Sequence, residues 1–354
     1  MNFGKELIEM AKHMPYDLKQ MQSLPLDVKI VMTQQRIRQW YEYWDGDVYV
    51  SFSGGKDSTV LKHIVDGMYS DVPALFVNTG LEYPEIQSFV REVKSGKYGF
   101  FNSDIEIVRP EMRFDEVIKK YGYPLISKEI SERIYYAKNG ADWAIQCMSG
   151  VNPDGSKSEF KQRNKKYEFL VDSQIPVSHK CCTVMKKNPA KRYERETGRK
   201  PLLGTMACES VLRKTQWMKV GCNAFEGKRP RSAPMSFWTE QDILQYIKKY
   251  DVPICSVYGD IIATDKGEQI DGQLTTFDLL GDYENTMLST TGCNRTGCIF
   301  CMFGCHLEKE PNRFQRLKET HPRQYKYCIG GVKWWTETGS HQMKDSALDM
   351  YLTI

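Results

Sequence analysis

The chain has 354 residues, of which 41% are hydrophobic, 27% charged and 12% aromatic. This hydrophobic fraction can supply a packed core and excludes wholesale disorder, and the length indicates one large α/β unit with elaborations. With 49 basic and 45 acidic residues the net charge is +4, which neither requires nor excludes a nucleic-acid partner. The sequence has no apolar run of about 18 residues and no apolar signal core at its start, so we expect a cytoplasmic protein without a membrane span.

Helix-like and strand-like segments alternate from the N-terminus. Residues 1–45 have a helical pattern, because apolar and aromatic side chains recur at three- and four-residue spacing between Val28 and Trp44. Strands separated by helix-length segments predict βαβ units, so the expected fold is α/β with a doubly wound, mainly parallel sheet. The predicted strands are 48–53, 74–80 and 104–110, and the predicted helices between them are 57–68 and 84–93.

The second half of the chain is less regular. Pro189 should lie in an early turn of its helix or kink it. Thr239, followed three residues later by Asp242, predicts the start of a helix that ends near Tyr250. The other expected elements are a helix over 114–137, an exposed polar and basic insertion over 151–167, a helix over 183–195, a strand over 200–207 and a helix over 209–220.

The 11 cysteines are an odd number in a long chain without a signal-peptide pattern, which argues against a disulfide scaffold. Four of them lie within residues 293–305, a density typical of a metal or iron–sulfur site, and Cys181 and Cys182 are adjacent upstream. We interpret the scattered ones as small buried hydrophobic residues. These are Cys147, Cys208, Cys222 and Cys255.

The most specific motif is Ser53-Gly54-Gly55-Lys56-Asp57-Ser58, which follows a predicted strand and opens a predicted helix. The glycines allow successive amides to point at one ligand, and the helix N-terminus adds partial positive charge. The lysine adds a full charge and the two serines add hydroxyl donors. Such a loop is typical of phosphate binding, above all of the pyrophosphate part of a nucleotide, although it matches neither the Walker A nor the G-x-G-x-x-G spacing.

The string S-G-G-K-D-S resembles the signature of the PP-loop ATP pyrophosphatases, which cleave ATP between the α and β phosphates. Four further segments resemble the phosphoadenosine phosphosulfate (PAPS) reductase-like branch of that superfamily. Two positions depart from the branch pattern, since Asn78 replaces an acid and Met206 replaces an arginine. The segments are 78–85 (D-T-G-x-x-x-P-E in the branch), 123–129 (P-x-x-S-K), 204–213 (G-x-R-x-x-E-S-x-x-R) and 233–239 (P-x-x-x-W-T).

This resemblance covers residues 48 to about 255 and implies an adenine nucleotide alpha hydrolase-like fold. It divides the chain into an N-terminal helical segment (1–45), a PP-loop nucleotide-binding domain (46–255) and a cysteine-rich region (256–354). It also implies a set of nucleotide-binding residues. They are Ser53, Gly54, Gly55, Lys56, Asp57, Ser58, Thr79, Gly80, Lys128, Glu209 and Ser210.

Catalysis is expected from Lys56, Asp57 and Arg213. Asp57 would hold Mg²⁺, because a hard cation prefers oxygen ligands. Lys56 and the loop amides would stabilise charge on the pyrophosphate leaving group. Lys128 and Arg213 are also consistent with solvated helix charges, and Glu209 with an acid that favours a helix N-terminus.

Residues 179–189 resemble the Cys-Cys segment that, with a distant C-x-x-C, ligates the iron–sulfur cluster of plant-type and bacterial adenylylsulfate reductases. They also resemble a cysteine-bearing segment of the DNA phosphorothioation branch. This resemblance favours a [4Fe–4S] cluster over zinc, which Cys293, Cys298, Cys301 and either Cys305 or His306 would satisfy alone. The expected cluster ligands are Cys182, Cys293, Cys298 and Cys301, with Cys181 and Cys305 as substitutes.

The function expected from the resemblance is cleavage of ATP to AMP and pyrophosphate, which adenylates an acceptor from which sulfur then displaces AMP. One alternative is a PAPS or adenylylsulfate reductase that uses Cys328, because residues 345–354 contain no cysteine. Another is a non-catalytic nucleotide-binding module with a zinc knuckle.

The resemblance and the basic segments suggest which partners to test. The phosphorothioation branch makes DNA the first acceptor to test and tRNA the second, and a cysteine desulfurase is a hypothesis for the sulfur donor. A homodimer is a further hypothesis. Basic residues with interspersed aromatics are consistent with a nucleic-acid partner or with ordinary solvated helix faces. They gather at 157–166, 186–195 and 228–231.

Overall fold

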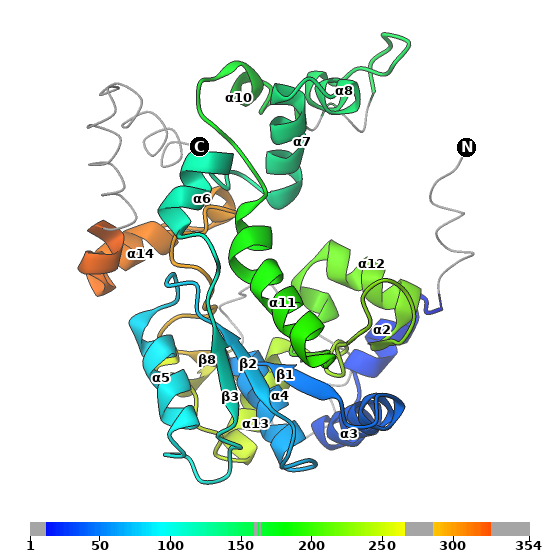
Figure 1. Ribbon diagram of the computed structural model, residues 1–354, viewed down its shortest axis with the longest axis vertical. Helices are drawn as coiled ribbons and strands as arrows, with labels where there is room; N and C mark the ends of the chain where they lie inside the picture. The colour runs from blue at the N-terminus through cyan, green and yellow to red at the C-terminus, as the bar shows by residue number, and fades with distance from the viewer. Residues whose placement is uncertain (1–11, 159–161, 163, 266–285, 327–354) are drawn as a thin grey trace. The chain divides into compact units, whose positions relative to one another are not determined.

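The structure is a computed structural model that describes residues 12–158, 162, 164–265 and 286–326 (Figure 1). The chain divides into two compact units, each assembled from separated stretches. The first unit comprises Met1–Asn78, Tyr83–Val108 and Ala190–Thr296. The second comprises Thr79–Glu82, Arg109–Pro189 and Gly297–Ile354. None of the described helices combines the length and apolar character needed to cross a membrane.

In its described residues, the first unit contains a six-stranded sheet in the order β3-β2-β1-β4-β6-β5. All neighbouring strands are parallel except β5 and β6, so the expected α/β fold with a mainly parallel sheet is confirmed. The chain runs outward from β1 to β3 and returns to β4 on the other side of β1. The strands are β1 (Val48–Ser51), β2 (Ala74–Val77), β3 (Ile105–Val108), β4 (Lys200–Leu203), β5 (Asn223–Ala224) and β6 (Arg231–Ser232).

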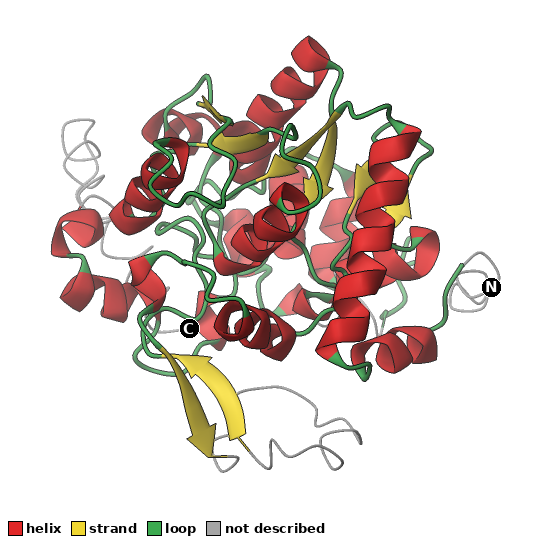
Figure 2. Ribbon diagram, turned by 90° about the horizontal axis from the view of Figure 1, so that it is seen from below, coloured by secondary structure: helices red, strands yellow, loops and turns green. Residues whose placement is uncertain are grey.

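Helices of the first unit flank this sheet, and the expected N-terminal helices are present in the described residues. A separate antiparallel pair, β7 (Ile261–Asp265) and β8 (Thr286–Thr290), stands apart from the sheet in Figure 2. The helices are α2 (Pro15–Gln22), α3 (Leu26–Tyr43), α4 (Lys56–Asp66), α5 (Pro84–Lys94), α12 (Val211–Val220) and α13 (Glu240–Lys249), with 3₁₀ turns η2 (Ala207–Glu209) and η3 (Ser256–Tyr258).

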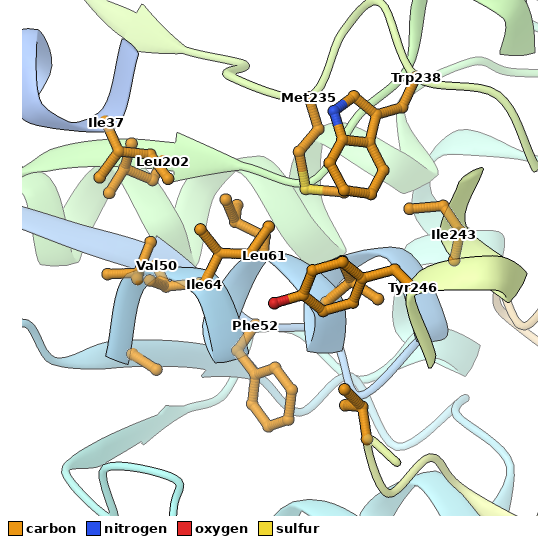
Figure 3. Packing of buried hydrophobic residues seen from close by; sticks show 14 of the residues in the cluster. Ile37, Val50, Phe52, Leu61, Ile64, Leu202, Met235, Trp238, Ile243 and Tyr246 are labelled. Carbon is orange, nitrogen blue, oxygen red and sulfur yellow. The ribbon is translucent and has the colours of Figure 1, made fainter. Parts of the chain in front are cut away.

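The core of the first unit follows from the alternation of side chains along the strands. Val48 and Val50 of β1 belong to the main core, together with apolar residues of α3, α4, α5 and α13. Figure 3 shows Val50 in this core with residues of α3, α4 and α13. Tyr49 points to the opposite face and packs with Leu75 and with Tyr193 of α11 (Asn188–Thr197). Helices therefore cover both faces of the sheet, as a buried parallel sheet requires.

The second unit is mainly helical. Its cysteine-rich stretch is tied to two other segments, because the Ile299 amide donates to the Leu81 carbonyl at 2.8 Å and the Gly304 amide to the Ile126 carbonyl at 2.7 Å. Phe300 packs against Phe114, with 4.6 Å between ring centroids. The elements are α6 (Phe114–Tyr121), α7 (Lys128–Lys138), α8 (Asp142–Ser149), α10 (Phe169–Asp172), the π-helical turn η1 (Thr183–Lys187), η5 (Cys305–Leu307) and α14 (Arg313–Thr320).

Two expectations for local structure are corrected here. The single helix expected over 114–137 is wrong, because the chain breaks at Gly122, whose φ is +105°. A side chain at Gly122 would stand 2.5 Å from the backbone carbonyl of Pro176, so the segment approaches too closely for a helix to continue. Of the expected exposed insertion over 151–167, residues 153–157 are exposed, but Tyr167 is buried in the core of the second unit.

Two other expectations are confirmed. Thr239 caps α13, since its hydroxyl accepts from the Asp242 amide at 3.3 Å while the Asp242 carboxylate accepts from the Thr239 amide at 2.7 Å. Pro189 lies in the first turn of α11, directly after the π-helical turn η1.

The buried ion pair between Lys29 and Asp242 ties α3 to α13 and provides a test of this fold. Both side chains are almost fully buried and their charged atoms lie 2.8 Å apart. Lys29→Met leaves an uncompensated buried carboxylate, so we expect the free energy of unfolding to fall by about 3–5 kcal/mol in urea titrations. Lys249→Met removes an exposed pair with Asp27 and should cost less than about 1 kcal/mol. Equal losses in the two variants would contradict this assignment.

Candidate functional site

The predicted phosphate loop lies where the strand order of the sheet reverses. Ser51 at the end of β1 is in register with Leu203 at the end of β4, and both strands lead into candidate site segments. In open α/β sheets, ligands bind beside the carboxyl ends of strands at this point. Gly204 lets the two segments approach, because a side chain there would stand 3.0 Å from the Asp57 carbonyl and from the Ser58 Cα.

The loop between β1 and α4 has the geometry that its glycines predict. Gly54 has a φ of +71°, and a side chain on it would stand 3.0 Å from Ile86 and Val90. Gly55 is the N-cap of α4, and a side chain there would lie 3.2 Å from the hydroxyls of Ser53 and Thr296. Only glycine combines this conformation with such close packing.

The amides of the loop are bonded to hydroxyl groups. The Ser53 amide donates to the Ser58 hydroxyl at 3.1 Å, and the Gly55 amide to the Ser53 hydroxyl at 3.3 Å. The Lys56 amide donates to the hydroxyl of Tyr258 at 3.1 Å. Each of these acceptors is a neutral hydroxyl oxygen. The helix dipole at the N-terminus of α4 favours a negatively charged acceptor in the same place, such as a phosphate oxygen.

The ammonium of Lys56 is buried and paired within the first unit. It donates to the Asn294 carbonyl at 2.6 Å and forms an ion pair with Glu240 at 2.9 Å. The Tyr258 ring centroid lies 5.2 Å from it. These three partners were not predicted from the sequence. The Trp-Thr-Glu string at the start of α13 offered a signal for Glu240, but no pattern points to a backbone carbonyl at residue 294.

The side chain of Asp57, next to Lys56, is partly buried. Burial raises the pKa of Asp57 to about 6, and Glu209 and Glu240 add to the rise, whereas Lys56 and Arg295 oppose it. Its Oδ1 atom is buried and has no hydrogen-bond partner among the described residues. Buried polar atoms are almost always partnered, and a carboxylate oxygen suits a hard cation such as Mg²⁺.

Glu209 forms ion pairs with two arginines of the first unit. Its carboxylate accepts from the Met206 amide at 2.8 Å and pairs with Arg295 at 2.9 Å and with Arg213. Ser210 is the N-cap of α12, because its hydroxyl accepts from the Arg213 amide at 3.3 Å. The structure therefore brings Glu209, Ser210 and Arg213 into the unit that contains the loop, with each of them engaged in a local contact.

Three of the predicted nucleotide-binding residues belong to the second unit. Thr79 is fixed by Glu82, whose carboxylate accepts from the Thr79 amide at 3.1 Å and from its hydroxyl at 2.6 Å. Gly80 has a φ of +76° in the same turn. Lys128 is the first residue of α7, and its charge acts on Cys182.

Four thiols are neighbours within the second unit. Burial raises the pKa of Cys182, Cys298 and Cys301, and in each case a neighbouring cysteine adds to the rise. Cys181 is also buried, and its pKa is raised by burial and by the other three cysteines. The structure thus brings Cys182, Cys298 and Cys301 together with Cys181, which the sequence analysis gave as a substitute ligand.

Lys186 is the cation beside these thiols. Its side chain is hydrogen-bonded to Cys298, and although burial opposes its charge, Cys298 and Glu82 hold its pKa above the ordinary value. Lys186 lies on the π-helical turn η1, which follows Cys182 directly. Lys186 opposes the rise in the pKa of Cys182, Cys298 and Cys301 and so favours their thiolate forms, although burial dominates and keeps all three pKa values raised.

The remaining metal candidates differ in their surroundings. Cys293 belongs to the first unit, where it is an electrostatic neighbour of Cys255. In the second unit Cys305 is buried and is an electrostatic neighbour of Cys301, while the Nε2 atom of His306 lies 3.4 Å from the Tyr167 hydroxyl. Cys328 lies outside the described residues. Among the residues that are described, no group of three or more His, Cys, Asp or Glu side chains converges closely enough to hold a metal ion.

The scattered cysteines were expected to be buried. This expectation is confirmed for Cys222 and Cys255. It is wrong for Cys208, which is exposed, while Cys147 is only half-buried. Cys208 lies in the short turn η2, whose neighbouring residue Ala207 provides the buried contact.

Comparisons with known proteins add the following findings. A family model described as the phosphoadenosine phosphosulfate reductase domain matches residues 47–139 and 144–302. No curated protein matches the chain. Among solved structures, the chain is similar to a phosphoadenylyl-sulfate (PAPS) reductase from Candida auris in a phosphate complex, with 17% identity and a TM-score of 0.35 over 63% of this chain and 82% of that chain.

The raised pKa of Asp57 predicts a specific pH dependence of stability. The carboxyl titrates at about 6 in the folded protein, against an ordinary value of 3.8. The folded state binds this proton more tightly, so the stabilisation it provides is complete below about pH 4 and is lost as the pH rises through about 6. Asp57→Asn removes this loss, and we expect the variant to gain up to about 3 kcal/mol on the wild type between about pH 4 and pH 8.

Urea titrations across this pH range measure the difference. Asp260→Asn is the matched control, because Asp260 is exposed on the surface of the same unit and should leave the pH profile unchanged. If the free energy of unfolding depends on pH in the same way in the wild type and in Asp57→Asn, folding does not raise the pKa of Asp57.

Proposed function

This chain belongs to the phosphoadenosine phosphosulfate reductase domain family, and we propose that it binds ATP at the Ser53–Ser58 turn and cleaves it to AMP and pyrophosphate. The observation that carries the proposal is the Asp57 carboxylate, whose Oδ1 atom is buried and has no partner among the described residues, next to the buried Lys56 at the N-terminus of α4. A structural turn needs neither a buried carboxylate oxygen without a partner nor a buried lysine. Both groups suit a ligand that carries phosphate and a divalent cation together.

In the proposed reaction, an acceptor oxygen attacks the α-phosphorus of ATP in line. The bond from that phosphorus to the oxygen that bridges the α and β phosphates breaks, and its electron pair leaves with pyrophosphate. The amides of Gly55 and Lys56 and the helix dipole of α4 would stabilise the growing negative charge. The acceptor would then carry AMP. A persulfide sulfur would attack the acceptor atom bonded to the AMP oxygen, that bond would break as AMP leaves, and a thiol reductant would cleave the resulting disulfide to release the thiolated product.

Asp57 is the residue that would hold Mg²⁺. When bound, Mg²⁺ would neutralise phosphate charge. A cation at Asp57 would also offset the repulsion from Glu209 and Glu240 that helps to raise the pKa of this carboxyl. Lys56 would contribute a second positive charge once its present partners are replaced.

A [4Fe–4S] cluster is part of the proposal for the second unit. The chemistry of the donors supports it, since Cys181, Cys182, Cys298 and Cys301 provide four neighbouring thiols and Lys186 provides a counter-charge. Among the described residues, these thiols do not converge closely enough to form a metal site. Cys293 as a ligand stays a prediction. When bound, a cluster of this kind supplies electron transfer or carries sulfur.

A reductase that acts on a sulfonucleotide is the second candidate. The description of the matching family model favours it, because that model is named for phosphosulfate reduction. The loop would then bind the phosphate groups of the sulfonucleotide. The two candidates differ in their products, which are AMP and pyrophosphate in one case and sulfite in the other.

A nucleic-acid acceptor is proposed from the basic residues of the first unit. Arg229 pairs with Glu194 of α11 at 3.4 Å, so the basic segment at 228–231 lies beside the basic helix α11. Clustered cations of this kind support binding to a phosphate backbone. DNA is the first acceptor to test and tRNA the second, a cysteine desulfurase is the proposed sulfur donor, and the assembly is proposed to be a homodimer.

The nucleotide products provide the central test. Incubation with α-labelled ATP and Mg²⁺, with and without DNA or tRNA, should yield AMP and pyrophosphate. Lys56→Ala and Asp57→Ala should each lower the rate by about 10²-fold or more, because each removes charge stabilisation at the phosphates. Lys97→Ala is the control, since Lys97 forms an exposed ion pair with Glu92. Sulfite release from a phosphosulfate without AMP formation from ATP would establish the reductase instead.

The cluster has an independent spectroscopic test. Protein prepared without oxygen should be brown and contain iron and sulfide, and Cys298→Ser should lose this colour because a thiolate ligand is removed. Cys147→Ser is the control, since Cys147 is not among the candidate ligands. A colourless protein with stoichiometric zinc would contradict the iron–sulfur assignment.

A further inference from the structure

Among the described residues of the first unit, three buried lysines pair with a carboxylate. The pairs are Lys29–Asp242, Lys62–Asp66 and Lys56–Glu240. In the first two, the carboxylate side chains are buried as well, with 8% and 2% of their surface exposed. Glu240 differs, because 47% of its side chain is exposed. Its carboxylate can therefore move into solvent, provided that another anion takes its place beside the buried Lys56 ammonium.

The fold does not depend on the Glu240 carboxylate. Thr239 and Asp242 cap α13 reciprocally, so the start of this helix is fixed without the residue between them. Ile243 and Ile247 of the same helix supply its buried contacts. Among the described residues, the only partner of the Glu240 carboxylate is Lys56. The ion pair with Lys56 therefore explains the position of the Glu240 carboxylate.

Other groups complete a closed arrangement around Lys56. The Asn294 carbonyl accepts from its ammonium, and the Tyr258 hydroxyl accepts from its backbone amide. Thr296 in turn bonds to the Tyr258 hydroxyl at 2.6 Å. Protein oxygens therefore occupy both the charged end and the amide of Lys56, which are the donors that a phosphate group would use.

The Glu240 carboxylate also stands where an anion would bind. It lies 2.9 Å from the Lys56 ammonium, whereas the carboxylate of Glu209 is paired with Arg213 and Arg295. A phosphate group that approaches the loop must compete with Glu240 for Lys56 and meets its negative charge at the same time. Removal of that charge should make the loop a better phosphate site.

We propose that Glu240 is a positioning residue that holds Lys56 in a closed arrangement until a phosphate-bearing ligand replaces it. Lys56 then exchanges the Glu240 carboxylate for phosphate oxygens, and Glu240 turns into solvent. No covalent bond changes in this exchange. The inference rests on the proposed phosphate-binding function of the Ser53–Ser58 turn, and it adds that this turn is closed before the ligand arrives.

The test uses the full chain and inorganic pyrophosphate at a fixed Mg²⁺ concentration, with binding measured by calorimetry. Glu240→Gln should lower the Kd about fivefold, because it removes a competing ion pair that is half exposed. Glu42→Gln is the matched control, since Glu42 is exposed at the end of α3 and gives the same change in net charge. It should leave the Kd unchanged.

A second background shows whether Glu240 acts through Lys56. Lys56→Met should weaken binding, and adding Glu240→Gln to it should then give no gain in affinity. A gain of the same size in that background would overturn the closed arrangement, and so would an unchanged or weaker Kd for Glu240→Gln alone. If neither the wild type nor Glu240→Gln binds pyrophosphate, ATP or a phosphosulfate, the proposed function itself fails. A Glu240→Gln variant that binds where the wild type does not would support both.

Discussion

A lysine ammonium that is removed from water needs oxygen partners around it, and this requirement organises the candidate site. Lys56 stands at the N-terminus of α4, where the helix dipole already disfavours a cation. The Asn294 carbonyl and the Glu240 carboxylate compensate the charge. Because the two partners come from distant parts of the sequence, the position of one side chain links α4, α13 and the segment after β8.

The same requirement explains the charges around Asp57. A carboxylate beside a buried lysine would ordinarily have a lowered pKa, yet burial and two further acids raise the pKa of Asp57 instead. Glu240 pairs with Lys56, and Glu209 pairs with Arg213 and Arg295, so among the described residues the Asp57 carboxylate is the charge that no ion pair compensates. Its desolvation is destabilising unless a ligand relieves it, and destabilised arrangements of this kind concentrate at functional sites.

The fold was largely readable from the sequence, because its signals are local. The glycines at 54 and 55, the reciprocal cap of Thr239 with Asp242 and the apolar runs of the strands each depend on neighbouring residues. The break at Gly122 was missed because its cause is the distant carbonyl of Pro176, which no sequence spacing encodes. Cys208 was assigned to the core for a similar reason, since composition alone does not say which way a short turn directs a side chain.

The candidate site was predictable in its central loop and much less so in its surroundings. The motif located Lys56 and Asp57, but the groups that contact them come from α13, η3 and the segment 294–296. The thiols were predictable to a similar extent. The C-x-x-C spacing identified Cys298 and Cys301, but only the folding of the second unit brings Cys181 near them. Cys293 belongs to the first unit, although only five positions separate it from Cys298.

Lys186 and Lys56 show why partner exposure is informative about function. Lys186 is hydrogen-bonded to the Cys298 thiol in one unit, and Lys56 forms an ion pair with the Glu240 carboxylate in the other. Glu82, which also acts on Lys186, is itself buried and fixed by Thr79, so the charge balance beside the thiols is built into the fold. The balance at Lys56 depends instead on a half-exposed acid. The first arrangement suits a group that stays in place, and the second suits a ligand that binds and leaves.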